Sequence, residues 1–252
     1  MAPAVSSPNL RLGRALGWAT AGVGLLAAAL ATTTPPRSGP FCTYGCLGPP
    51  YTDAAVFVPR DYWWVYPQSL LLLLVLGLLV CVHHAAAPAV RVFSGLAVAL
   101  ATLANAALLA DYVIQLAVLQ PSLLRGETGA LSLFSQYNPH GIFIALEDLG
   151  YLLLGLALLS TAGVFTEPSR LARGLRWLLL VGGGLTVIAL PALAIAYGTD
   201  LEYRYEVAAI ALTWVTLIPG AILLTRWFHP TAAERPAADE RLSAHEPATP
   251  LP

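Results

Sequence analysis

The chain has 252 residues, of which 57% are hydrophobic and only 11% charged, and its formal net charge is −1. A soluble domain carries about 25% charged residues, so this composition excludes an ordinary soluble domain. The near-neutral charge, with no basic patch interleaved with aromatic residues, also gives no indication of nucleic-acid binding. The predicted fold class is therefore all-α, a polytopic membrane protein.

Six apolar segments approach or reach the length of about 20 residues that a helix needs to cross a bilayer. They predict a bundle of six transmembrane helices, forming one domain over residues 1–228 with an irregular extracytoplasmic cap. The expected spans are residues 12–31, 68–83, 92–119, 141–165, 177–197 and 206–227. Residues 229–252 are rich in Pro, Ala and charge without apolar periodicity, and we expect a disordered cytoplasmic tail there.

The distribution of arginine predicts the orientation, because cytoplasmic loops are enriched in basic residues. With both termini inside, the cytoplasmic side receives Arg11, Arg14, Arg91, Arg170, Arg173, Arg176, Arg226, Arg235 and Arg241, and the outer side only Arg37, Arg60, Arg125 and Arg204. All 13 basic residues are arginine, which, with abundant Ala, Leu, Gly and Pro, is typical of a GC-rich bacterial genome. We therefore expect a multi-pass protein of the bacterial inner membrane.

The first span has a second interpretation. Arg11 and Arg14, an apolar core and then Ala29-Leu30-Ala31 also fit a signal peptide with its cleavage site. The apolar run is long for a signal peptide, which favours an uncleaved helix, and the other five spans keep their orientation in either case.

The outer loop of residues 32–67 is rich in Pro and Gly, which predicts irregular structure. Cys42 and Cys46 would lie on the oxidising side of the membrane, where we expect a disulfide. A redox-active pair is the alternative, although CxxxC is not the usual CxxC spacing. Cys81 lies in apolar surroundings and is expected to be a packed thiol. The aromatic residues of this loop, Tyr62, Trp63, Trp64 and Tyr66, are interpreted as anchors at the headgroups.

Three acidic residues lie inside predicted spans. Asp111 is about eight residues from the outer end of the third span, and Glu147 and Asp148 about seven from the outer start of the fourth. At 1.5 Å per residue both sets lie roughly 10–13 Å below the outer surface. An ionised acid in lipid costs about 2.5–3.5 kcal/mol or more, so we expect these side chains to face the bundle interior, a hydrated cavity or a partner.

Helical spacing adds polar neighbours to these acids. His140, Glu147 and Tyr151 would share one stripe of the fourth span, and Gln115 shares a face with Asp111. The predicted ligand- or ion-binding residues are therefore Asp111, Gln115, His140, Glu147, Asp148 and Tyr151, with Asn105 and Tyr112 beside them. Asp148 points about 100° away from Glu147, which favours Glu147 as the ligand.

Two alternatives for this cluster remain open. In the first, the groups hydrogen-bond one another, with one or two acids protonated, and lock the bundle. In the second, His140, Glu147, Asp148 and Asp111 hold a metal as imidazole and carboxylate ligands, although no ligand motif such as HExxH occurs. We predict no cofactor, no metal as the leading interpretation and no catalytic residue.

Three further features weigh less. Glu202 and Glu206 are interpreted as interfacial, with an extended acidic vestibule as the alternative. Gly182-Gly183-Gly184 predicts a packing surface, and Pro191 a kink in the fifth span.

The leading functional hypothesis is a small transport or ligand-binding membrane protein whose acidic intramembrane site takes a proton, a cation or an amine. The expected partners are the lipid bilayer and this small ligand, with a membrane protein or a second copy also open. The alternatives are a structural or assembly subunit of a membrane complex, or a membrane enzyme that depends on a metal or on the cysteine thiols. The interpretation leans away from an enzyme.

Overall fold

The computed structural model describes residues 7–127, 129 and 131–229. Its helices are α1 (Ser7–Thr32), α2 (Val65–Ala85), α3 (Arg91–Ile114), α4 (Gln120–Arg125), α5 (Leu131–Phe134), α6 (Ile142–Thr161), α7 (Arg170–Tyr197) and α8 (Tyr203–Trp227). Short 3-10 helices are η1 (Gly39–Phe41), η2 (Thr52–Phe57), η3 (Arg60–Tyr62), η4 (Pro88–Val90), η6 (Ala162–Val164) and η7 (Gly198–Asp200), and η5 (Gln115–Leu119) is a π-helical turn. No strand occurs within these ranges, which confirms the all-α class.

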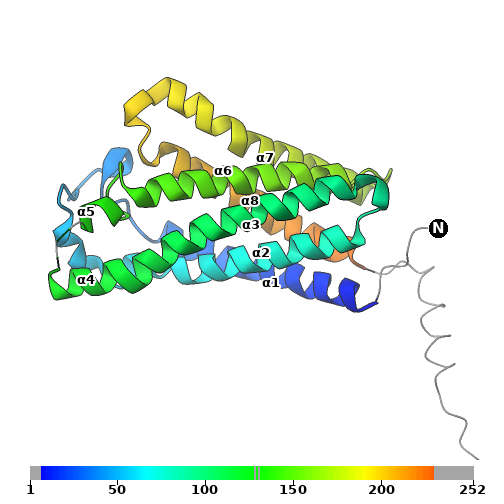
Figure 1. The fold of residues 1–252 in the computed structure, drawn as a ribbon, viewed down its shortest axis with the longest axis horizontal. Coiled ribbons are helices and arrows are strands. Elements are labelled where there is room, and N and C mark those ends of the chain that lie inside the picture. Colours follow the sequence, from blue (N-terminus) through cyan, green and yellow to red (C-terminus); the bar gives the residue numbers. More distant parts are fainter. Residues whose placement is uncertain (1–6, 128, 130, 230–252) are drawn as a thin grey trace, which may run out of the picture.

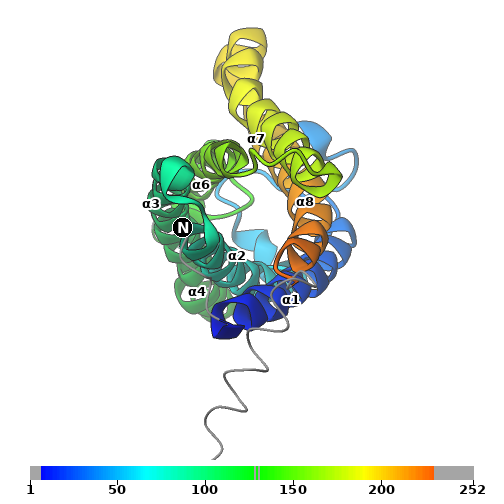
Figure 2. The same ribbon diagram turned by 90° about the vertical axis from the view of Figure 1, so that its right-hand side faces the viewer.

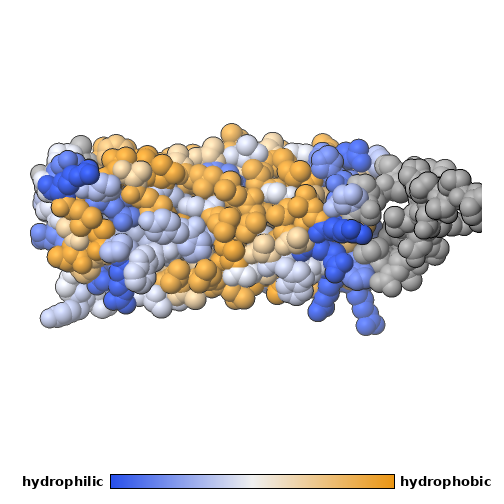
Figure 3. Space-filling model, turned by 90° about the horizontal axis from the view of Figure 1, so that it is seen from below, coloured by the Kyte–Doolittle hydropathy of each residue, from blue (hydrophilic) through white to orange (hydrophobic). Residues whose placement is uncertain are grey.

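Six helical segments of the described chain are long and apolar enough to cross a membrane, as the sequence predicts. They are Pro8–Thr32, Arg60–Ala85, Pro88–Arg125, Ile142–Val164, Arg170–Asp200 and Tyr203–Trp227. Figure 3 shows apolar side chains along the middle of the molecule and hydrophilic ones gathered toward both ends. The chain is therefore a multi-pass membrane protein. The predicted tail lies outside the described residues, apart from His229, whose N–H still bonds to the carbonyl of Arg226.

The long helices α1, α2, α3, α6 and α8 form a closed ring that is visible end-on in Figure 2. Neighbours in the chain pack side by side, and α1 closes the ring against α8. Because α6 also contacts α8 directly, α7 lies on the outside of the bundle. Its second half leans away from the other helices (Figures 1 and 2). Pro191 lies within this half, and its ring removes one backbone hydrogen bond from the helix.

The N-terminal half of α7 packs closely against α6 and α8 because two successive residues are glycines without side chains. A Cβ on Gly182 would overlap Thr216 of α8, and a Cβ on Gly183 would lie 2.7 Å from both the carbonyl oxygen of Gly155 and the amide nitrogen of Leu159 on α6. These glycines are the packing surface that the sequence predicts, since small residues let membrane helices approach.

The third span is continuous but locally widened. Pro121 has no N–H to offer the carbonyl of Ala117, and the turn opens so that the Gln120 N–H bonds to the carbonyl of Gln115, five residues earlier. The π-helical turn η5 therefore joins α3 to α4 just after Asp111.

The segments before α2 and before α6 form a cap that has its own small hydrophobic core. The ion pair of Arg37 and Asp61 has a distance of 2.9 Å from Nε to Oδ2, and Asp61 is only 1% exposed. The Tyr137 hydroxyl donates to the same carboxylate at 3.3 Å, and the guanidinium lies 3.8 Å from the ring centre of Phe57. The ion pair closes the segment between α1 and α2 on itself, and the Tyr137 hydroxyl ties that segment to the one before α6.

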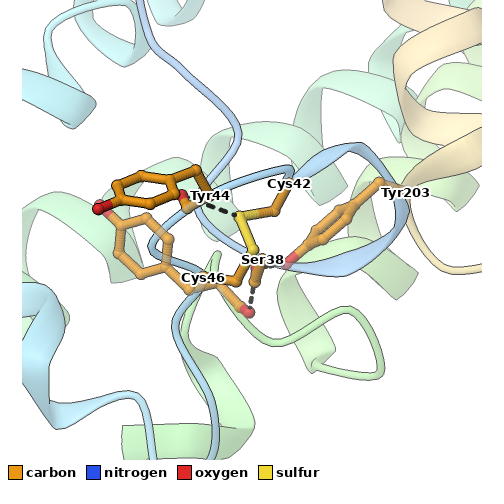
Figure 4. Close-up of a disulfide and its surroundings, with 6 residues drawn as sticks. Ser38, Cys42, Tyr44, Cys46 and Tyr203 are labelled. Atoms are coloured by element: carbon orange, nitrogen blue, oxygen red, sulfur yellow. Dashed lines mark hydrogen bonds between the residues drawn. A yellow bond between two sulfur atoms is a disulfide. The ribbon is translucent and has the colours of Figure 1, made fainter.

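The disulfide between Cys42 and Cys46 is present, as predicted. It closes a turn beside a second cap contact: the Ser38 hydroxyl donates to the carbonyl of Tyr137 and lies 2.7 Å from the hydroxyl of Tyr203, at the start of α8 (Figure 4). Tyr44, inside the turn, points outward and is 94% exposed. Cys81 is a free buried thiol.

Two of the predicted aromatic anchors are placed differently. Trp63 and Tyr66 are exposed, which suits contact with headgroups, but Tyr62 and Trp64 are buried. Tyr62 belongs to the cap core, and Trp64 packs edge-on against Tyr112 with 5.6 Å between ring centres. The anchor interpretation is wrong for these two because α2 already begins at Val65 and turns them inward.

Candidate functional site

A chain of hydrogen bonds crosses the half of the bundle nearer the cap and joins four helices. The Tyr112 hydroxyl on α3 donates to Oε1 of Glu147 on α6 at 2.8 Å and lies 3.1 Å from the Tyr151 hydroxyl. Gln68 Nε2 on α2 donates to Tyr151 at 3.0 Å, and Trp214 Nε1 on α8 donates to Gln68 Oε1 at 3.1 Å. We call these five residues the polar network.

Local geometry explains why the network forms. Glu147 and Tyr151 are four residues apart on α6, so they lie on one face and both meet Tyr112 of the neighbouring helix. Glu147, Tyr112, Tyr151 and Gln68 are all 0% exposed. Polar groups buried this deeply must bond to one another, because each would otherwise lose its hydration without compensation.

Other acids surround Glu147. Glu206 of α8 lies within hydrogen-bonding reach of the Glu147 carboxyl group, and Asp111 and Asp148 are close enough to interact with both electrostatically. One oxygen on each of these four side chains has no hydrogen-bond partner: Asp111 Oδ2, Glu147 Oε2, Asp148 Oδ1 and Glu206 Oε2. The network is therefore satisfied on its tyrosine side and open on its acidic side.

No basic side chain neutralises these acids within the described part of the chain. The ion pairs there are Arg37 with Asp61 and Arg204 with Glu202, both at the cap end of the bundle. Two adjacent carboxylates in a medium of low dielectric constant repel each other, and a buried charge is tolerated only when it is paired. Glu147 is 0% exposed whereas Glu206 is partly exposed, and repulsion between two neighbouring ionised carboxylates favours a proton or a cation between them.

A cavity of about 380 Å³ opens beside this pair, between the cap, the end of α1 and α8. Its lining includes the polar residues Arg37, Ser38, Gln136, Tyr203 and Glu206. The apolar part of the lining includes Trp64, Phe143, Val207, Ile210, Ala211 and Trp214. The cavity thus touches both the acidic side of the site, at Glu206, and the far end of the polar network, at Trp214.

The structure brings together four of the six residues predicted for the site: Asp111, Glu147, Asp148 and Tyr151. Asp111 is 1% exposed, whereas Asp148 is only half-buried. Gln115 points elsewhere, because its Nε2 donates to the carbonyl of Phe134 and fixes the short helix α5.

His140 does not join the acids. The expected stripe assumed that the helix already includes this residue, but α6 begins at Ile142, and Gly141 is extended with φ −82° and ψ 167°. His140 therefore lies in an exposed turn. Within the described ranges no group of three or more His, Cys, Asp or Glu side chains is arranged to hold a metal ion.

Sequence reasoning missed two members of the network and misplaced Glu206. Gln68 and Trp214 are uncharged, so neither stands out in an apolar segment. Glu206 was placed at the interface because the last span was expected to begin there, but α8 starts at Tyr203, one turn earlier. Counting depth from that earlier start would have brought Glu206 toward the other acids.

Searches against models of known protein families, curated proteins and solved structures find no match for this chain.

Proposed function

We propose that this protein is a small ligand-binding or transport protein whose acidic site in the outer half of the membrane takes a proton, a cation or an amine. The observation that carries the proposal is the carboxyl pair of Glu147 and Glu206, with one unpartnered oxygen on each side chain and no basic neighbour. Asp111 and Asp148 add negative charge around the same place, and Tyr112, which also bonds to Tyr151, orients Glu147 from the other side.

Energetics favour an occupied site. Each ionised acid in a membrane interior costs about 2.5–3.5 kcal/mol on insertion scales. Four carboxyl oxygens at this site accept no hydrogen bond from a neighbouring side chain, so the acids need a proton or a cation beside them. A bound proton or cation supplies the missing partner, and a cavity that reaches Glu206 supplies a route for it.

The placement in the cell follows the same proposal. Both termini would be cytoplasmic in the bacterial inner membrane, and the cap would face the oxidising side, where the disulfide of Cys42 and Cys46 is stable. The acidic site would then open outward.

The test uses the full chain in lipid vesicles with sodium, tetramethylammonium and a short alkylamine as probes. Thermal stabilisation by each probe and its uptake under an imposed pH gradient would be measured for the wild type and the triple variant Asp111→Asn, Glu147→Gln, Asp148→Asn. We expect at least one probe to stabilise or enter in the wild type only, while both proteins insert equally. A triple variant with higher thermal stability and unchanged probe response would show that the cluster is a lock.

A further inference from the structure

We infer that the cavity beside α8 binds an amphipathic amine, with the cationic group against Glu206 and the apolar chain along α8 toward Trp214. The inference rests on the proposed function and names both the entry site and the class of ligand. In this inference the first acid that the ligand contacts is Glu206 on α8, and not Asp111 on α3 or the acids on α6.

The shape of the cavity sets the size and polarity of the ligand. Its volume of about 380 Å³ lies in the range of sites for small organic molecules, about 300–1,000 Å³. Tyr203 and Trp214 are 11 residues apart on α8, so the cavity wall runs about 16 Å along this helix at 1.5 Å per residue. A hydrated proton or a small metal ion would leave most of this apolar wall uncovered.

The charges in the wall set the sign of the ligand. The lining includes one basic residue, Arg37, whose guanidinium already bonds to both carboxylate oxygens of Asp61. Glu206 has no basic partner, and one of its oxygens is buried without a donor. The uncompensated charge of the cavity is therefore negative, which selects a cation.

The balance of acidic and basic residues in the lining also argues against a phospholipid headgroup as the ligand. An aminophospholipid brings a phosphate group with its amine, and that phosphate would need a free cation in the polar wall. Arg37 is committed to Asp61, and it also lies 3.8 Å from the ring centre of Phe57. A simple amine with an apolar chain would pair its cationic group with Glu206 and cover the apolar lining, and it carries no phosphate that needs a cation.

Glu206 also connects the ligand to the buried site. Its carboxyl group contacts Glu147, which Tyr112 holds from the other side at 2.8 Å. A cation at Glu206 would stand next to the unpartnered Oε2 of Glu147 and pair with both acids. Trp214, at the apolar end of the cavity, would contact the alkyl chain of the ligand. Its indole N–H donates a hydrogen bond to Gln68.

Photoaffinity labelling tests the site. A C8 alkylamine that carries a diazirine on its chain would be cross-linked to the full protein in vesicles, and the labelled peptide mapped by mass spectrometry. We expect saturable labelling of α8 between Val207 and Trp214, competed by unlabelled amine but not by the matched alcohol, by an alkyl sulfate or by added phosphatidylethanolamine.

Matched variants separate charge from shape. Glu206→Gln should weaken amine binding at least tenfold, whereas Glu202→Gln, which removes a nearby acid outside the cavity, should leave it unchanged. Ala211→Phe should block the apolar wall, whereas Val215→Phe, on the same helix but outside the lining, should not. Equal binding by Glu206→Gln and wild type would overturn the inference.

The remaining outcomes are distinct. An amine that depends on Asp111, Glu147 and Asp148 but labels α3 or α6 would overturn the inference and keep the proposed function. Competition by phosphatidylethanolamine would identify a lipid headgroup as the occupant and also overturn the inference. If no cation or amine responded to any of these variants, the inference and the proposed function would fail together.

Discussion

The hydroxyl of Tyr112 and the carboxyl group of Glu147 meet at 2.8 Å across the interface of α3 and α6, and neither residue is exposed. Tyr112 also contacts Tyr151, so one phenol hydroxyl holds both polar residues of α6. Removal of this hydroxyl therefore affects the whole network, while a change at Glu147 alters only its acidic side.

The first prediction concerns this hydroxyl. Tyr112→Phe should lower the free energy of unfolding by about 1–3 kcal/mol, because it leaves a buried carboxyl oxygen without its donor. Thermal unfolding in detergent would measure the difference, with the exposed Tyr66→Phe as a control that should stay at the wild-type value. A Tyr112→Phe protein as stable as the wild type would show that the bond contributes nothing.

Two neighbouring glycines of α7 allow a matched pair of variants with opposite expected effects on stability. Gly183→Ala should destabilise the protein, because the new methyl group would meet backbone atoms of α6 that cannot move aside without separating the helices. Gly184→Ala should be neutral or stabilising by up to about 1 kcal/mol, since nothing lies within 4 Å of its added Cβ and alanine favours the helix. The unfolding temperatures of the two variants would be measured. Equal changes in both would contradict this packing of α7 against α6.

A third prediction addresses the cap. Arg37→Ala leaves Asp61 buried without its counter-ion and should cost about 3 kcal/mol, at the lower end for a buried pair because Arg37 is 21% exposed. Arg204→Ala breaks a longer contact of 3.5 Å to Glu202 and should cost about 1 kcal/mol or less. Protease cleavage in residues 32–64 would report the loosened cap, and equal cleavage of the two variants would argue against a special role for Arg37.

The cap should also respond to alkaline pH. Burial raises the pKa of Tyr137 above its usual value of about 10. The unfolded chain therefore loses this proton above about pH 10 while the folded protein keeps it, and the stability of the cap should fall as pH rises beyond that point. The hydrogen bond to Asp61 raises the pKa of Arg37, so the ion pair itself persists. Tyr137→Phe should show a shallower loss of protease resistance between pH 10 and 11.5, and an unchanged slope would refute this assignment.

The sequence was most informative where physical chemistry leaves few options. Runs of about 20 apolar residues predict membrane helices, and an acid within such a run stands out because its burial is costly. That reasoning located Asp111, Glu147 and Asp148. It could not locate Gln68 and Trp214, because neutral residues that pair only in the folded bundle leave no such pattern. It placed His140 wrongly because helical periodicity does not show that Gly141 interrupts the helix. It named Glu206 as part of an acidic vestibule only as an alternative, because the expected start of the last span was about one turn late.

The central claim is that the carboxyl pair of Glu147 and Glu206 takes a cation, and calorimetric titration of a C8 alkylamine into wild-type and Glu147→Gln protein in lipid nanodiscs tests it most directly. Glutamine keeps an acceptor for Tyr112 but cannot carry the charge, so the bundle should stay folded while the site loses its ligand. We predict saturable binding of one amine to the wild type and an affinity at least tenfold lower in the variant. Equal affinities, or a more stable variant beside a wild type that binds no cation, would contradict the account.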